Sequence, residues 1–265
     1  MQLSQDSFQS VVELFERVSG IRYGTDKRQL VIGRLNRLAI ESGAANLDEY
    51  VEVLLRERDP EEITRVVDRL TTNETYFFRE PQHFTLLDEL AQRHDRRRPF
   101  RVWSAASSSG EEAYSAAMVL ADRLGTSPWE IVGTDLSLQM IQTARTALYP
   151  TTRINGISPQ RLKRYCLKGQ GQYDGSLLIS RVLRERVKFQ QANLMQALPP
   201  LGQFDVVFLR NVLIYFDADS KRAIVKRVAA HLAEHGLLFI GHAESLTNVT
   251  YDVAAVQPAV YEKAG

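Results

Sequence analysis

Polar side chains recur directly after the apolar segments in the second half of the sequence, where a binding or catalytic site is expected. Glu111 and Glu112 follow the apolar run 100–106, and Asp135 follows the run 130–134. Because ligands of an open parallel sheet bind beyond the carboxyl ends of its strands, these groups are expected to share one crevice. Later apolar runs are followed by Asn193, Leu194, Arg210, Asn211, Gly241, His242, Glu244 and Ser245.

The turn before Glu111 indicates which ligand this crevice holds. A carboxylate in the position of Asp135 can accept hydrogen bonds from both hydroxyls of a ribose, an arrangement that serves any adenosine cofactor. A dinucleotide site needs the pattern G-x-G-x-x-G, whereas the turn 105–110 reads AASSSG with a single glycine. An anion at Glu111 repels a pyrophosphate and attracts an ammonium group, which favours S-adenosylmethionine over NAD. Taken alone, Glu111 is better explained as an acid that interacts favourably with a helix start.

A second polar cluster is the segment TTNETYFFRE, residues 71–80, at the end of the first half of the sequence. Its polar members include Asn73, Thr75 and Arg79, and they surround an aromatic block at 76–78. A connector packed by its aromatic side chains explains that block. It does not explain the polar set, which makes this segment a second candidate for the site.

The elements that must position these residues fall into two parts. Residues 1–95 have helical periodicity, with helices expected over 6–20, 26–43, 47–58 and from 60 towards 70. Beyond the arginine-rich stretch 93–101, apolar strands alternate with amphipathic helices, which is typical of a parallel α/β sheet. The strands are expected at 100–106, 130–135, 187–193, 204–211, 236–242 and 259–263, and the helices at 111–125, 137–148 and 219–236.

One segment interrupts this alternation. Gly169, Gly171 and Gly175 separate short alternating apolar and polar runs within residues 161–188. This pattern predicts a small antiparallel β insertion in place of a crossover helix.

Composition excludes several classes of protein. A net charge of +1 argues against general nucleic-acid binding, and the sequence lacks a long apolar run or a secretion signal. The single cysteine, Cys166, excludes an internal disulfide and paired-cysteine zinc sites, so we expect a cytoplasmic protein without membrane insertion. No oligomerisation motif is evident, and a monomer is expected.

The basic residues are segregated in spite of the near-neutral total. Residues 17–40 carry six basic side chains and one acid, and residues 161–188 carry eight basic side chains and two acids. Either patch alone is better explained as a solvated face. Two such patches on a near-neutral protein suggest docking to an acidic partner.

Four motifs, in order, resemble the CheR-type glutamate methyltransferases of chemotaxis receptors: TTNETYFFRE, VWSAASSSGEEAYS, FLRNVLIYF and LLFIGHAES. The resemblance covers nearly the whole sequence. It implies an all-α domain at 1–75, a linker helix at 76–98 and a Rossmann-like domain at 99–265 that binds S-adenosylmethionine. It also implies a three-stranded β-subdomain at about 161–188.

The resemblance also implies roles for individual residues. Tyr215 faces the transferring methyl group, and Arg79 or Arg210 holds the second oxygen of the substrate carboxylate. The cofactor-binding residues are Asn73, Thr75, Arg79, Glu111, Asp135, Asn193, Leu194, Arg210 and Asn211. The expected receptor contacts are Lys27, Arg34 and Arg37 with the acidic methylation region, and Gly169 and Gly171 with a C-terminal tail added as an extra strand. No metal is expected.

The reaction implied is methyl transfer to a glutamate carboxylate, which needs no strong base because this group, with a pKa of about 4.3, is ionised at pH 7. A small-molecule methyltransferase of the same fold remains an alternative, since fold does not fix the substrate. A second alternative is an adaptor that binds S-adenosylmethionine without turnover. The basic patches favour a protein substrate, and the set Arg79, Arg210 and Tyr215 favours an enzyme.

Overall fold

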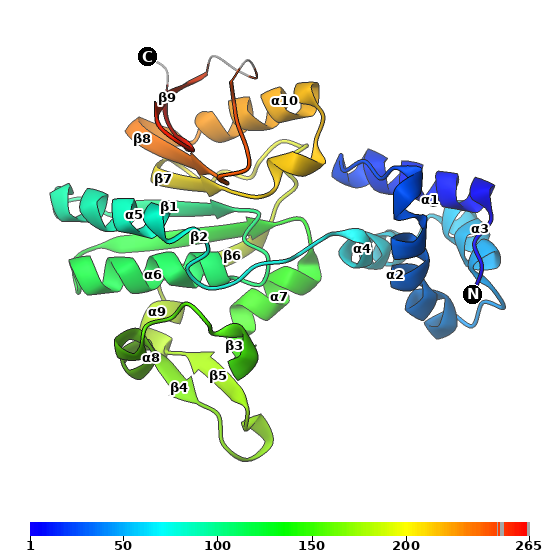
Figure 1. Ribbon diagram of the computed structural model, residues 1–265, viewed down its shortest axis with the longest axis horizontal. Coiled ribbons are helices and arrows are strands. Elements are labelled where there is room, and N and C mark those ends of the chain that lie inside the picture. The colour runs from blue at the N-terminus through cyan, green and yellow to red at the C-terminus, as the bar shows by residue number, and fades with distance from the viewer. Residues whose placement is uncertain (248, 250–251, 264–265) are drawn as a thin grey trace.

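The computed structural model describes residues 1–247, 249 and 252–263, in a helical part and an α/β part that residues 71–80 connect (Figure 1). The helical part contains α1 (Gln5–Ser19), α2 (Arg28–Glu41), α3 (Leu47–Glu57) and α4 (Pro60–Leu70). Local signals set these limits: the Ser4 hydroxyl caps the start of α1, and Gly20 ends it with a φ of 75°. Within the described residues, no helix is both long and apolar enough to cross a membrane.

A mixed sheet forms the centre of the α/β part, with strand order β6-β2-β1-β7-β8-β10-β9 in the part of the chain that the structure describes. The first five strands in this order are parallel, and β10 is antiparallel to its neighbours β8 and β9. The bounds are β1 (Phe100–Ala105), β2 (Trp129–Asp135), β6 (Val187–Gln191), β7 (Phe204–Leu209), β8 (Leu232–Ile240), β9 (Val253–Gln257) and β10 (Val260–Lys263). The chain order reverses between β1 and β7, which is the switch point where such sheets bind ligands.

Alternation along the strands divides the core into two layers. Val102 and Val206 belong to a cluster with the helices α5 and α6, whereas Trp103 and Val207 face the opposite side of the sheet. The helices of this part are α5 (Pro81–Arg93), α6 (Glu111–Leu124), α7 (Leu138–Thr146) and α10 (Ala218–Ala229).

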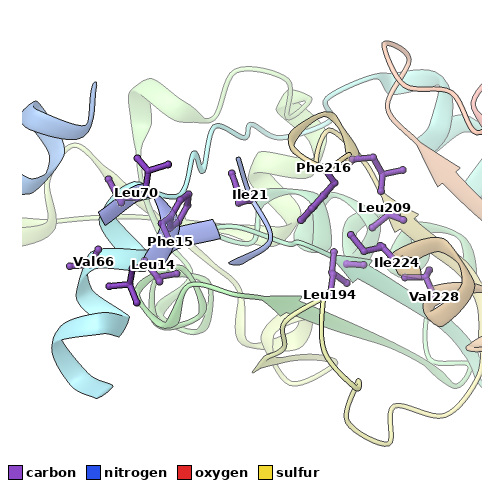
Figure 2. Close-up of a cluster of buried hydrophobic side chains, with 14 of the residues drawn as sticks. Leu14, Phe15, Ile21, Val66, Leu70, Leu194, Leu209, Phe216, Ile224 and Val228 are labelled. Atoms are coloured by element: carbon purple, nitrogen blue, oxygen red, sulfur yellow. The ribbon is translucent and has the colours of Figure 1, made fainter. Parts of the chain in front are cut away.

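The second layer runs without a break into the helical part (Figure 2). Phe15 of α1 and Leu70 of α4 lie at one end of this cluster, and Leu209 of β7 lies at the other. Ile21 lies between the two groups and is 8% exposed. The helical part therefore packs on the sheet domain through a shared hydrophobic core.

The expected antiparallel insertion is confirmed. Strands β3 (Leu148–Pro150), β4 (Cys166–Lys168) and β5 (Ser176–Ile179) form a separate sheet in the order β3-β5-β4, flanked by α8 (Pro159–Tyr165) and α9 (Arg181–Arg184). The sheet begins before residue 161, because residues 148–150 pair with 176–178. Gly169 and Gly171 shape its hairpin: a Cβ at Gly169 would collide with the Tyr173 carbonyl, and Gly171 has a φ of 59°.

The structure corrects two helix limits. The linker helix expected at 76–98 is the shorter α5, which begins with Pro81 in its first turn and ends at Arg93. The helix expected over 219–236 ends at Ala229, and residues from Leu232 onward form β8. Leu232 is fully buried and pairs with Phe204 of β7, so its burial in the sheet outweighs the helical periodicity of the local sequence.

Candidate active site

A cavity opens at the carboxyl edge of the sheet, at the switch point between β1 and β7. Its empty volume, counted together with the open mouth, is about 1010 Å³. The ends of β1, β2, β6 and β7 contribute to it, together with the connecting segment 71–80. Of the residues singled out from the sequence, Asn73, Thr75, Arg79, Asp135, Asn193, Leu194, Arg210, Asn211 and Tyr215 line it.

Asp135, at the end of β2, is 7% exposed. Its two carboxylate oxygens accept the backbone N–H groups of Ser137 at 2.9 Å and Ser108 at 2.8 Å. Burial raises the pKa of Asp135 to about 6, although these two N–H donors oppose the rise. The N–H of Ser108 is occupied by this bond, so the turn after β1 does not offer it to a phosphate.

The two acids that begin α6 lie in different surroundings. Glu112 lines the cavity, and its carboxylate accepts the Ser104 hydroxyl at 2.7 Å. Glu111 is fully buried, accepts the Ser109 hydroxyl at 2.6 Å and is not among the cavity-lining residues. Burial raises the pKa of both carboxyls. The structure thus places Glu112 on the wall of the site, where the sequence analysis had assigned Glu111.

Arg210 follows β7, and its side chain is 1% exposed. Its guanidinium lies between two carboxylates, 3.2 Å from Glu80 Oε2 and 3.1 Å from Glu112 Oε2, and it donates to the backbone carbonyl of Arg79. Burial acts to raise the pKa of Glu80, but Arg210 and Asn211 outweigh it and hold this pKa below its usual range. With its charge already shared, Arg210 organises the wall of the cavity.

Arg79 and Tyr215 are less buried than Arg210. Arg79 is partly exposed, donates to the Glu74 carbonyl at 3.2 Å and lies 5.6 Å from the centre of the Tyr76 ring. Burial raises the pKa of Tyr215, while a hydrogen bond with Thr72 and the charge of Arg79 oppose the rise. Both side chains line the cavity and are partly exposed.

The connecting segment is fixed mainly through its backbone. Arg34 donates to the carbonyls of Leu70 at 2.6 Å and Thr71 at 3.1 Å, and Ser108 donates to the carbonyl of Asn73 at 3.0 Å. Two residues that follow, Phe78 and Glu80, have φ values of 56° in the left-handed region. Such strain persists only where the surroundings enforce it, and it often marks a functional segment.

The basic face of α2 is less uniform than its spacing indicates. Lys27 and Arg37 are exposed, and among the described residues their ion-pair partners are the nearby Asp26 and Glu41. Arg34 instead points into the domain junction through the bonds described above. Of the three expected receptor contacts, Lys27 and Arg37 are exposed, whereas Arg34 is partly buried and already bonded within the protein.

Three groups near the wall have the composition of a metal site. Ligand atoms of Glu80, His83 and His242 lie within 4.8 Å of one another. Burial, and then the charge of Arg210, lower the pKa of His83 to about 4. The guanidinium 3.2 Å from Glu80 already supplies the positive charge, which disfavours a metal cation beside it.

Two partners of Arg210 had no assigned role in the sequence analysis: Glu112, which lines the cavity, and Glu80, which is not among the lining residues. Glu80 binds Arg210 and accepts the Asn211 side-chain amide at 3.3 Å, and Glu112 completes the same network. The sequence does indicate that such partners exist, because the charge of Arg210 at a buried strand end must be compensated by carboxylates.

Comparison with known proteins agrees with this site. The family model "CheR methyltransferase, all-alpha domain" matches residues 6–71, and "CheR methyltransferase, SAM binding domain" matches residues 73–261. A chemotaxis protein methyltransferase of Salmonella typhimurium is 36% identical, with 98% of this chain and 90% of that protein covered. Chemotaxis protein methyltransferase 2 of Pseudomonas aeruginosa is 38% identical, covering 98% and 94%. The Escherichia coli chemotaxis protein methyltransferase is 38% identical, covering 93% and 87%. The resemblance seen in the four motifs is confirmed, and the chain belongs to the CheR methyltransferase family.

Proposed function

We propose that the protein transfers methyl groups from S-adenosylmethionine to glutamate side chains in the cytoplasmic domain of a bacterial chemoreceptor. The observation that carries this proposal is the acid-lined cavity at the switch point of the sheet. Asp135 lines the cavity at the end of β2, where its carboxylate could bind the hydroxyls of a ribose. In the turn after β1, the backbone N–H of Ser108 already donates to Asp135 and is not free to bind a pyrophosphate. The names of the relatives as chemotaxis methyltransferases support the choice of substrate.

The residues of the cavity fit this cofactor. Asp135 would accept the ribose hydroxyls, and Asn193 and Leu194 would flank the adenine. The amino group would meet the acidic start of α6, where Glu112 lines the cavity and Glu111 shares its Arg153 partner with the Thr75 carbonyl. The remaining cofactor contacts would come from Asn73, Thr75, Arg79, Arg210 and Asn211. The cofactor supplies a methyl group on a positively charged sulfur.

The substrate carboxylate would enter past Arg79 and Tyr215. Arg79 is the better arginine for this contact, because Arg210 is already paired with two carboxylates. The Tyr215 hydroxyl would orient the attacking oxygen, and the apolar wall would remove water from it. Alignment of this kind can supply roughly 7–11 kcal/mol of the barrier, which suits a reaction that needs no strong base.

Docking would involve two surfaces outside the cavity. Lys27, directly before α2, and Arg37 on α2 would meet the acidic methylation region of the receptor. The β4–β5 hairpin, with Gly169 and Gly171 in its loop, would accept a receptor tail as an added strand at the β4 edge.

The direct test is methyl transfer followed by alkali. The protein is incubated with methyl-labelled S-adenosylmethionine and cytoplasmic receptor fragments, and the labelled fragments are then treated with mild base. Glutamate methyl esters hydrolyse and release the label as methanol, whereas N-methyl groups do not. Base-stable label would contradict the ester. Cofactor binding without transfer to any fragment would favour the adaptor alternative.

A further inference from the structure

The side chain of Arg153 links the inserted β-subdomain to the cavity region. Arg153 ends a short 3-10 helix, Thr151–Arg153, that directly follows strand β3 of the insertion. Its Nη2 atom lies 3.2 Å from Oε1 of Glu111, and it donates to the Thr75 carbonyl, also at 3.2 Å. One guanidinium therefore joins the insertion to the start of α6 and to the connecting segment that lines the cavity.

Glu111 depends on this contact. Its side chain is fully buried, and its Oε1 atom has no hydrogen-bond partner among the described residues apart from the ion pair with Arg153. The other oxygen accepts the Ser109 hydroxyl. A buried carboxylate needs a positive or hydrogen-bonding partner to remain ionised, and Arg153 is the cation in contact with this one.

Other contacts show that the insertion packs closely on the same segment. Gly156 has a φ of 114°, and a Cβ there would collide with the carbonyl of Phe77. The Phe77 ring packs edge-on against Tyr149 at 5.0 Å, and the Tyr149 hydroxyl donates to the Ser109 carbonyl at 2.7 Å. The insertion thus supports both the turn before Glu111 and the segment that contains Thr75.

We propose that Arg153 is a positioning residue for cofactor binding, which fixes the Glu111 carboxylate and the Thr75 backbone for the amino-acid end of S-adenosylmethionine. The inference rests on the proposed function, since it assumes that this cofactor occupies the cavity. It gives the β-subdomain a role in the cofactor site in addition to docking.

The test is calorimetric titration with S-adenosylhomocysteine from pH 5.5 to 8.5. Arg153→Ala is expected to weaken binding about 10-fold at pH 7, the scale of one lost charged contact. The loss should grow as the pH falls, because Glu111 without its cation takes up a proton more readily. Arg153→Lys should restore part of the affinity. Arg164→Ala is the matched control: Arg164 belongs to the same insertion and pairs with Asp122 at 3.2 Å, away from the cavity, so binding should be unchanged.

A double-mutant comparison separates positioning from general loss of structure. In a Glu111→Gln background, Arg153→Ala should cost several-fold less affinity than in the wild type, because the two residues act together. Wild-type affinity in Arg153→Ala, or an equal loss in both backgrounds at every pH, would overturn the inference. If Arg153→Ala fails to fold, Arg153→Gln, which also removes the charge, carries the test, and wild-type affinity with wild-type pH dependence in that variant would overturn the inference. Absence of binding in the wild type would instead refute the proposed function.

Discussion

The wall of the cavity and the exposed face of α2 both present arginines beside acids, yet the two regions differ in what those pairs do. In the wall, Arg210 is 1% exposed and lies between Glu80 and Glu112. On α2, Arg37 is 71% exposed, and its ion-pair partner in the part of the chain that the structure describes is Glu41, one helical turn away. Removing one member of a buried ion pair leaves the other charge buried without a partner, which is costly. In an exposed ion pair, water solvates the remaining charge, so the cost is small. The ion pairs of the wall therefore stabilise the fold around the cavity, whereas the exposed basic side chains of α2 are available to bind a partner.

Arg34 shows that helical position alone does not assign a residue to either region. It lies on α2 with Arg37, but its guanidinium binds the carbonyls of Leu70 and Thr71 at the end of α4. Loss of these bonds would weaken the junction of the domains. Charge reversal at Arg34 would therefore change both receptor binding and protein stability, and the two effects could not be separated.

The largest effect is expected at Arg210. Arg210→Met leaves Glu80 and Glu112 without their cation and should lower the free energy of unfolding by about 3–5 kcal/mol. The measurement is denaturant unfolding, with Arg37→Met as the matched control, for which little change is expected.

The pH dependence sharpens this prediction. The lowered pKa of Glu80 contributes stability above the usual range of a glutamate, and that contribution is lost as the pH falls through the lowered value. Without Arg210, both carboxyls protonate more easily, so the difference between variant and wild type should narrow from pH 7 to pH 5. Equal free energies of unfolding for Arg210→Met and Arg37→Met at pH 7 would contradict the proposed difference between buried and exposed arginine pairs.

A smaller effect, on turnover, is expected at Tyr215. Tyr215→Phe keeps the ring in the cavity but removes the hydroxyl that would orient the attacking oxygen, and kcat for methylation of a receptor fragment should fall about 10-fold. Affinity for S-adenosylhomocysteine should remain close to that of the wild type. Parallel losses in turnover and cofactor affinity would contradict this role.

The smallest effect is expected on the α2 face. Lys27→Glu combined with Arg37→Glu should raise KM for a receptor fragment several-fold at low salt, because repulsion replaces attraction to an acidic partner. The effect should shrink at 0.5 M salt, where exposed charges are screened. Cofactor affinity provides the control. Unchanged KM at low salt and low receptor concentration would exclude this face from docking.

The sequence predicts the sheet and most of the cavity because both depend on local patterns. Apolar runs define the parallel strands, and the residues just after them, such as Asp135 and Asn211, meet at one edge by geometry. The segment 71–80 was identified from its polar residues, and the structure places it across the same edge.

The features that the sequence did not predict depend on long-range packing. Glu111 and Glu112 are adjacent acids, and only the packing of α6 decides that Glu112 lines the cavity. Leu232 has helical neighbours, but it is buried in β8 because β7 lies beside it. The role of Arg153 requires contact between segments about 40 and 80 residues apart, which no local pattern reveals.

The central claim is that the cavity binds S-adenosylmethionine through Asp135, and calorimetry tests it most directly. S-adenosylmethionine and S-adenosylhomocysteine are titrated into the wild type, Asp135→Ala and Asp135→Asn. We expect micromolar-range binding to the wild type that weakens as the pH falls through about 6, where Asp135 takes up a proton. Both variants should bind S-adenosylmethionine and S-adenosylhomocysteine at least about 10-fold more weakly than the wild type. Their affinity should not show the decrease at acidic pH. Wild-type affinity in both variants, or no binding of either ligand to folded wild-type protein, would contradict the claim.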